Sequence, residues 1–375
     1  MKILYCIPDL AYGGAEKQLS YLAAELAAVG HEVHVASRHG GPNLDRMKSA
    51  GVVWHRLGGT CNSDPFIFFR LVWLMRKLRP DVVQTILTPM DIMGGAAALL
   101  TRTPWVLRES SSAPLYTASW RNRVRRALGR LSDAIVSNSA GGYNYWRIEP
   151  SRRPLCVIPN AIPLDEIALA DSSRVEGFAF EHAEKVVLYA GRMDSAKNVE
   201  NLIAALAYLA DEMPFTALIC GDGPRRQHVE RMAHELGIAH RIFFTGYVEN
   251  LWGLMKRADA LVSLSRFEGC PNVVLEAMAC GCPLVVSDIP AHREILDERS
   301  ALFADPDEPK EVAAALKATL LYDDAARGRA RAARAMTGGR PVETTARLYE
   351  QLYLSLRGEA CELSQGVRAS DSEAA

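Results

Sequence analysis

Short apolar runs alternate along this chain with longer segments of helical periodicity. Apolar runs of strand length lie at residues 3–7, 32–37, 52–57, 82–86, 105–107, 134–137 and 155–158, and again at 185–190, 216–220, 242–244, 260–264, 284–287 and 301–303. Segments such as 15–29 and 199–210 separate them, with apolar residues at the spacing of one helical face. Strands that alternate with helices form parallel sheets through right-handed crossovers, so the pattern predicts an α/β fold.

The alternation stops once, which divides the chain into two predicted domains. Residues 164–184 are mostly polar without a clear period, and they form the predicted linker between a domain of residues 1–163 and a second of residues 185–337. The last helix is assigned to residues 338–357, and the small, polar residues 358–375 are predicted to be a disordered tail. A chain of 375 residues is long enough for two domains of ordinary size.

Charge is distributed unevenly between the two halves. Residues 1–160 contain 20 Lys and Arg against 11 Asp and Glu, whereas residues 161–375 contain 23 against 33. The two halves are therefore expected to meet different partners. No apolar run reaches the roughly 18 residues of a spanning helix, and the first residues are expected to form a strand and not a signal peptide. The eight scattered Cys indicate reduced thiols in a cytosolic protein.

Residues 265–283 carry the strongest functional pattern. They follow a strand, and they read as a loop with Gly and Pro and then a helix over residues 273–279. Glu268 lies in the loop and Glu276 in the helix, with seven residues between them. Backbone amides at a helix start attract anions, a loop carboxylate can accept hydrogen bonds from sugar hydroxyls, and a helical carboxylate can accept two from a diol such as ribose. A helix with two solvated Glu is the alternative, but it leaves the bracketing Pro and Gly unexplained.

This stretch resembles the Glu-seven-Glu signature of retaining glycosyltransferases with the GT-B fold, especially glycosyltransferase family 4. The resemblance extends from Gly13 to about Arg357 and is more specific in the second half. It implies two Rossmann-like domains with parallel sheets that face a central cleft, and a terminal helix that crosses back to the N-terminal domain. By the same resemblance, Glu268 contacts the donor sugar and Glu276 contacts the nucleotide ribose.

The resemblance also implies where the rest of the donor binds. Gly191-Arg-Met-Asp-Ser-Ala-Lys-Asn198 is similar to the family's pyrophosphate loop, so Arg192 and Lys197 are expected to bind the diphosphate. Tyr247 and Val248 are expected to face the base. The predicted catalytic residues are Glu268, Arg192 and Lys197, and the predicted donor contacts also include Gly14, Gly269, Cys270, Pro271, Asn272, Val273 and Glu276.

The first half is expected to bind the acceptor. The loop Tyr12-Gly-Gly-Ala-Glu16 is similar to a family loop that lines the cleft, which assigns Gly13 to the acceptor side. Many relatives have a His at the end of a middle strand, near the reacting carbon, but residues 105–110 contain none. Arg108 or Glu109 is expected to take a positioning role instead.

Two basic segments in the first half have two interpretations. Residues 65–80 and 120–130 are helical in pattern and rich in aromatic residues and Arg, so they either pack on the sheet with Arg stems in water or lie on an anionic membrane surface. The membrane interpretation uses Trp120, Phe66, Ile67, Phe68, Phe69, Arg121, Arg123, Arg125, Arg126 and Arg130. It suits a polyprenyl-linked acceptor and a cytoplasmic enzyme that is peripheral at the inner face of the cell membrane. No signature of nucleic-acid binding is present.

The predicted function is retaining transfer of a sugar from a nucleotide diphosphate sugar to a glycan or lipid-linked acceptor in cell-surface polysaccharide or glycoconjugate synthesis. UDP is favoured by its frequency in the family, and no cofactor or metal is expected. Asp305-Pro-Asp307 has a metal-binding spacing but is far in sequence from the diphosphate loops. Three alternatives stay open: a GT-B nucleotide-sugar epimerase, a dehydrogenase, which would need a Gly-x-Gly-x-x-Gly turn, and a non-catalytic nucleotide-sugar binding protein.

Overall fold

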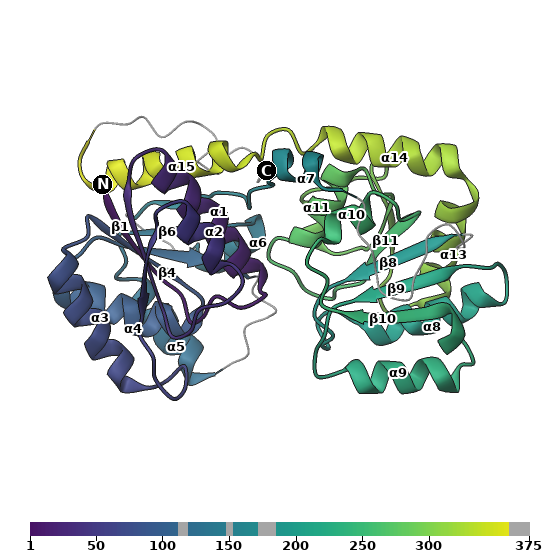
Figure 1. Cartoon of the computed structure of the whole chain (residues 1–375), viewed down its shortest axis with the longest axis horizontal. Helices are drawn as coiled ribbons and strands as arrows, with labels where there is room; N and C mark the ends of the chain where they lie inside the picture. The colour runs from purple at the N-terminus through teal and green to yellow at the C-terminus, as the bar shows by residue number, and fades with distance from the viewer. Residues whose placement is uncertain (112–118, 148–152, 172–184, 360–375) are drawn as a thin grey trace. The chain divides into compact units, whose positions relative to one another are not determined.

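The computed structural model describes residues 1–111, 119–147, 153–171 and 185–359. These residues form two compact units. Unit 1 contains residues 1–161 and the residues from Arg340 onward, and unit 2 contains residues 162–339. Each unit has one parallel sheet between two layers of helices (Figure 1).

Unit 1 is built on a seven-stranded sheet in the order β3-β2-β1-β4-β5-β6-β7, in which every paired strand is parallel. The strands are β1 (Lys2–Cys6), β2 (Glu32–Ser37), β3 (Val53–Arg56), β4 (Val82–Ile86), β5 (Trp105–Glu109), β6 (Ala134–Ser137) and β7 (Leu155–Val157). The strand order reverses between β1 and β4. In such doubly wound sheets, ligands bind outside the carboxyl ends of the strands at the reversal.

Helices cover both faces of the unit 1 sheet. One face carries α1 (Gly14–Ala28), α2 (Leu44–Ser49) and α15 (Val342–Leu356), and the other carries α3 (Pro65–Leu78), α4 (Thr88–Thr101), α5 (Trp120–Gly129) and α6 (Ala140–Trp146). Figure 1 shows α15, in yellow, alongside α1. The buried hydroxyl of Tyr353 donates to Gln84 at 2.6 Å and lies 3.1 Å from that of Tyr5, so α15 completes the interior of unit 1.

Unit 2 has a six-stranded parallel sheet in the order β10-β9-β8-β11-β12-β13. The strands are β8 (Val186–Ala190), β9 (Thr216–Cys220), β10 (Ile242–Gly246), β11 (Ala260–Ser263), β12 (Leu284–Ser287) and β13 (Leu302–Ala304). One face carries α8 (Val199–Ala210), α9 (Arg226–Glu235) and α13 (Pro309–Leu321), and the other carries α7 (Leu164–Leu169), α10 (Leu251–Met255), α11 (Asn272–Cys280) and α14 (Asp323–Ala335). The short helices η3 (Ala239–Arg241) and α12 (Pro290–Arg293) lie in connections.

The predicted α/β fold with two Rossmann-like domains is confirmed, and every predicted strand is present. The predicted linker differs at its start, because residues 164–169 form α7 and belong to unit 2. The mostly polar sequence of this segment gave no sign of a helix, yet Ile167 is buried in the core of unit 2. Residues 172–184 and the tail from residue 360 lie outside the described residues. No helix in the described ranges is long and apolar enough to cross a membrane.

Candidate active site

The predicted donor residues lie in loops at the carboxyl edge of the unit 2 sheet. Arg192 and Lys197 lie between β8 and α8, and Glu268 lies between β11 and α11. Because β8 and β11 pair directly and run parallel, the loops that follow them leave the sheet side by side. The sheet thus brings together residues that are far apart in sequence.

The ammonium of Lys197 and the carboxylate of Glu268 form an ion pair. The same carboxylate oxygen, Oε1, accepts a hydrogen bond of 2.7 Å from the hydroxyl of Ser265. Burial alone would raise the pKa of Glu268, but Lys197 and Ser265 together hold that pKa below its ordinary value, so the group is ionised at neutral pH. The two side chains of the pair are 30% and 13% exposed, so solvent and ligands can reach them.

The loop that carries Lys197 owes its shape to Asp194. Its Oδ1 accepts hydrogen bonds from the backbone amides of Ala196 and Lys197, both at 3.1 Å, which is the geometry of an Asx-turn. Asn198 follows in the left-handed region, at φ 55°, and its side-chain amide donates to the carbonyl of Pro306 at 2.7 Å. These contacts fix the backbone at the point where Lys197 leaves it.

The contact with Pro306 places the segment 305–307 beside the loop that carries Lys197, although the two segments are distant in sequence. The carboxylate of Asp307 pairs with Arg266 at 2.6 Å, and Arg266 also donates to the carbonyl of Ser195. Asp305 accepts from the amide of Asp307 at 2.9 Å. Within the described residues, no three or more His, Cys, Asp and Glu are grouped to hold a metal ion.

Arg192 is held more loosely than Lys197. Its side chain is 72% exposed, and its Nε lies 3.7 Å from the carboxylate of Asp194. The backbone around it is tightly packed, because a Cβ on Gly221 would lie 2.0 Å from the carbonyl oxygen of Gly191. Gly221 also has a φ of +129°, which side chains rarely tolerate. The exposed guanidinium on this packed loop is accessible to an anionic ligand.

The predicted contacts of residues 269–273 lead into the first turn of α11. Cys270 and Val273 pack on the core of unit 2, and the first turn of a helix favours negative charge. Glu276 is buried one turn further on, where its Oε2 accepts a 2.7 Å hydrogen bond from the indole N–H of Trp252. In the loop after β10, Tyr247 is 54% exposed, and Val248 packs against the same core.

In unit 1, Gly13 precedes α1 as its N-cap, and Gly14 is the first residue of the helix. A Cβ on Gly13 would lie 1.9 Å from the carboxylate of Glu16, which folds back over this turn. Burial raises the pKa of Glu16 above its ordinary value. Because this carboxylate is the end of a flexible side chain that can move aside, the contact does not by itself require glycine at position 13, and the acceptor-side role of Gly13 stays a prediction.

Arg108 lies in β5 and is only 3% exposed. Its Nη2 donates to the side chain of Asn160 at 3.0 Å, and its guanidinium lies 6.0 Å from the centre of the Tyr349 ring. Its Nε and Nη1 are buried and make no hydrogen bond within the described residues. Buried unsatisfied donors are costly, so Arg108 is the residue of this pair with capacity for a further partner.

Glu109 is fully enclosed, and its carboxylate is engaged. Its Oε2 accepts hydrogen bonds of 2.8 Å from Arg125 and from the indole of Trp146. Arg125, in turn, pairs with Asp91 at 2.7 Å. The structure thus places Glu109 in the interior of unit 1. It also corrects the grouping of Arg125 with the exposed Arg of α5, because the Arg125 side chain is only 2% exposed.

The sequence analysis missed the side chains that hold the predicted ones. Ser265 precedes Glu268 by three residues, a short spacing at which a hydroxyl can cap a loop carboxylate, so its role was open to prediction. Trp252 lies 24 residues before Glu276, and nothing local marks it as a partner. Its contact exists only because α10 packs against α11.

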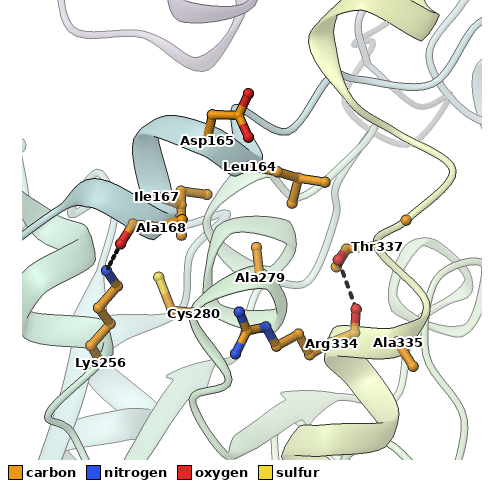
Figure 2. A pocket seen from close by; sticks show the side chains of 11 residues that line it. Leu164, Asp165, Ile167, Ala168, Lys256, Ala279, Cys280, Arg334, Ala335 and Thr337 are labelled. Carbon is orange, nitrogen blue, oxygen red and sulfur yellow. Dashed lines mark hydrogen bonds between the residues drawn. The ribbon is translucent and has the colours of Figure 1, made fainter.

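A cavity of about 780 Å³ opens elsewhere in unit 2. Figure 2 shows it between α7, the end of α11 and α14, with Arg334 directed toward Cys280 and with Lys256 bonded to the carbonyl of Ala168. None of the predicted donor residues lines it. The cavity lies at the end of α11, whereas the predicted contacts of residues 268–273 lie at its start, about 13 Å away for a helix of this length.

Comparison with known proteins follows the division into two units. The model of Glycosyltransferase Family 4 matches residues 12–166, and the model of Glycosyl transferases group 1 matches residues 174–336. Together they match most of the chain, and their boundary lies close to the boundary between unit 1 and unit 2.

Curated relatives and a solved structure agree with these matches. The chain is 29% identical over 340 residues to the GalNAc-alpha-(1->4)-GalNAc-alpha-(1->3)-diNAcBac-PP-undecaprenol alpha-1,4-N-acetyl-D-galactosaminyltransferase of Campylobacter jejuni, which covers 86% of this chain and 89% of the relative. It is 27% identical over 402 residues to a glycogen synthase of Mycobacterium tuberculosis, with 94% of each covered. The crystal structure of Anabaena Alr3699/HepE in complex with UDP and glucose has the same fold, with a TM-score of 0.83 at 20% identity over 95% of this chain and 100% of that one. The chain therefore belongs to glycosyltransferase family 4, and it is a glycosyltransferase of the GT-B fold.

Proposed function

We propose that this glycosyltransferase transfers a hexose or an N-acetylhexosamine from a UDP-sugar to a lipid-linked acceptor, with retention of configuration and without a metal ion. The observation that carries the proposal is the Lys197–Glu268 pair at the carboxyl edge of the unit 2 sheet. In the proposal, Lys197 is the cation for the diphosphate, and the ionised carboxylate beside it accepts hydrogen bonds from sugar hydroxyls.

Catalysis in this proposal consists of positioning and charge stabilisation. Lys197, Arg192 and the first turn of α11 supply positive charge where the departing diphosphate becomes more negative. Glu268 holds the sugar against rotation, and Glu276 holds the ribose. Because the loops are fixed before the donor arrives, little reorganisation accompanies the reaction.

The choice of donor and acceptor rests on similar proteins. The Campylobacter relative is named for an acceptor that ends in PP-undecaprenol, and the Anabaena structure contains UDP and glucose. Both fit a site with two cations and two carboxylates at the carboxyl edge of a sheet. A lipid-linked acceptor requires that unit 1 work beside a membrane.

The exposed face of α3 supports such a location at the inner face of the cell membrane. Phe66, Phe69 and Trp73 are 65%, 64% and 61% exposed, and their spacing of three and four residues places them on one stripe of the helix. Lys77 lies 4.9 Å over the ring of Trp73, and Arg70 is also exposed on this helix. Aromatic residues beside basic residues are typical of helices that lie in the headgroup region of anionic bilayers.

The function is tested by following UDP release from UDP-hexoses and UDP-N-acetylhexosamines, with and without a polyprenyl diphosphate-linked sugar. We expect release only when the acceptor is present, together with a product whose new linkage keeps the anomeric configuration of the donor. Conversion of a UDP-sugar without acceptor would instead identify an epimerase. Binding of UDP-sugars with no turnover under any condition would identify a binding protein and contradict the proposal.

The membrane location is tested by co-sedimentation with vesicles of phosphatidylglycerol and phosphatidylcholine at low salt. We expect the wild-type protein to sediment and the variant Phe69→Ser/Trp73→Ser to lose most of its binding. The matched control is Leu321→Ser/Tyr322→Ser, which removes two side chains of unit 2 that are 53% and 67% exposed. An equal loss of vesicle binding in both variants, or no binding of the wild-type protein, would contradict the proposal that α3 contacts the membrane.

A further inference from the structure

A buried histidine lies behind the Lys197–Glu268 pair. His292, in α12, is completely buried, and its pKa is lowered by burial. The carboxylate of Glu268 opposes that effect and the ammonium of Lys197 adds to it, so the ring lies within electrostatic range of both. Since the lowered pKa keeps the ring neutral at physiological pH, only one of its nitrogens carries a proton.

The contacts of His292 determine which nitrogen that is. Its Nδ1 lies 2.8 Å from the backbone carbonyl oxygen of Ser287 and 3.1 Å from the hydroxyl of the same residue. A carbonyl oxygen can only accept a hydrogen bond, so Nδ1 is the protonated nitrogen. The Nε2 of the ring then carries the lone pair, and it has no hydrogen-bond partner within the described residues.

From His292, hydrogen bonds lead to Glu268 in one direction. Since Nδ1–H donates toward Ser287, the Ser287 hydroxyl is left to donate its own hydrogen to the carbonyl of Ser265, at 2.6 Å. The hydroxyl of Ser265 donates to Oε1 of Glu268 at 2.7 Å. The Nδ1–H thus lies against both the carbonyl and the hydroxyl of Ser287, and each of the two serine hydroxyls has one acceptor, so the ring is linked to the loop through Ser287 and Ser265.

We propose that His292 is a positioning residue for sugar transfer, which acts by fixing the Ser287 hydroxyl and, through it, the loop from Ser265 to Glu268. The inference rests on the proposed function, because Glu268 is the group that is positioned. Without the Nδ1–H donor, the Ser287 hydroxyl can rotate away from Ser265. The loop carboxylate then loses its fixed place beside the sugar.

Two substitutions separate the hydrogen bond from the volume of the ring. The amide of His292→Asn can donate from about the position of Nδ1, whereas His292→Leu keeps an apolar side chain and donates nothing. Because Nε2 makes no hydrogen bond within the described residues, the Asn variant loses no hydrogen bond there. His292→Asn is therefore the matched control for His292→Leu.

The kinetic test measures kcat, the KM for UDP-sugar and the affinity for free UDP by calorimetry. We expect His292→Leu to lower kcat by about 100-fold while the affinity for UDP stays unchanged, and His292→Asn to keep most of the wild-type kcat. Equal losses in the two variants would mean that only the volume of the ring matters. That result, or a wild-type kcat in both variants, overturns the proposal.

A second measurement does not depend on any substrate. Nitrogen-15 NMR of the His-labelled protein reports the tautomer, and the signal of His292 is identified by its absence in His292→Asn. We expect a neutral ring protonated on Nδ1, and a ring protonated on Nε2 would overturn the proposal. If the wild-type protein transferred no sugar, the proposed function would fail, and the tautomer would show that the hydrogen-bond chain is nevertheless in place.

Discussion

Both sheets have a cation beside carboxylates at or just beyond their carboxyl edge, but the two groups differ in burial. In unit 2, the pair of Lys197 and Glu268 is 30% and 13% exposed. In unit 1, Arg125 is 2% exposed, and its partners Asp91 and Glu109 are completely enclosed. The two groups have similar chemistry and a similar place in the fold, and access to solvent separates them.

The difference decides what each group can do. A partly exposed pair can exchange one partner for a ligand, because solvent screens the charges during the exchange. An enclosed group cannot, since a departing partner would leave a charge unpaired in a medium of low dielectric constant. The contrast supports the proposed role of Lys197 and Glu268 in ligand binding, and it makes Arg125 with its two carboxylates a contributor to the stability of unit 1.

The largest effect is expected from Arg125→Met, which leaves two buried carboxylates without their cation. The free energy of unfolding should fall by about 3–5 kcal/mol, measured by urea denaturation. The control is Arg126→Met on the same helix, whose guanidinium lies 5.1 Å over the ring of Tyr145 and should contribute about 1 kcal/mol or less. Similar losses in both variants would mean that burial does not distinguish these Arg.

In unit 2, Lys197→Met should affect turnover and leave stability nearly unchanged. Loss of one preorganised charge at the diphosphate typically lowers kcat by roughly 100- to 1,000-fold. Lys185→Met is the matched control, because Lys185 pairs with Asp259 at 3.1 Å with side chains that are 29% and 30% exposed, at the start of β8 instead of its end. A comparable loss of turnover in the control would contradict the assignment of the site.

The enclosed group in unit 1 should also make the free energy of unfolding depend on pH. Burial raises the pKa of Asp91 to about 6, against the opposing effect of Arg125, so the folded protein binds this proton more tightly than the unfolded chain does. The contribution of Asp91 to stability is therefore complete below about pH 4 and is lost as the pH rises through about 6.

Asp91→Asn removes that titration. The free energy of unfolding of the variant should change less between about pH 4 and pH 7 than that of the wild-type protein, by on the order of 1–3 kcal/mol. Urea denaturation at several pH values measures the difference. Identical pH profiles would show that Asp91 does not titrate in this range.

The smallest expected effect separates the two carboxylates of unit 2. Glu276→Gln should weaken the binding of free UDP roughly tenfold, or about 1.4 kcal/mol, because it removes a charged acceptor for the ribose. The fold should persist, since Gln can still accept from the indole of Trp252. Glu268→Gln should leave the affinity for UDP unchanged and lower turnover. If calorimetry showed the same loss of affinity for UDP in both variants, the two carboxylates would not have separate roles.

The contrast between the two groups also shows which features of the structure could be predicted from the sequence. Local patterns predicted the strands, because a strand buried on both faces is a continuous apolar run. They also predicted the loops that carry Arg192, Lys197 and Glu268. They did not identify the one enclosed Arg of α5, because its partners Asp91 and Glu109 lie 34 and 16 residues away. Which member of a charged helix is buried depends on side chains that only folding brings near.

Local sequence patterns also did not predict which segments distant in sequence are in contact in the fold. Residues 305–307 are far in sequence from the loop that carries Lys197, yet Asn198 donates directly to Pro306. The partner of Glu276, Trp252, also lies on a different helix. Sequence patterns indicate which residues can do chemistry, and packing determines which residues hold them in place.

The position of α15 has a consequence for the order in which the protein is made. Residues 1–161 of unit 1 are synthesised before unit 2, but Tyr349, Leu352 and Tyr353 of α15 belong to the core of unit 1. All of unit 2 is therefore synthesised before unit 1 can close its interior. A stop codon shortly after residue 339 would spare every donor residue of unit 2 and still deprive the nascent first unit of its last helix. Early release or slow translation of the final segment is thus expected to harm the part of the protein that was made first.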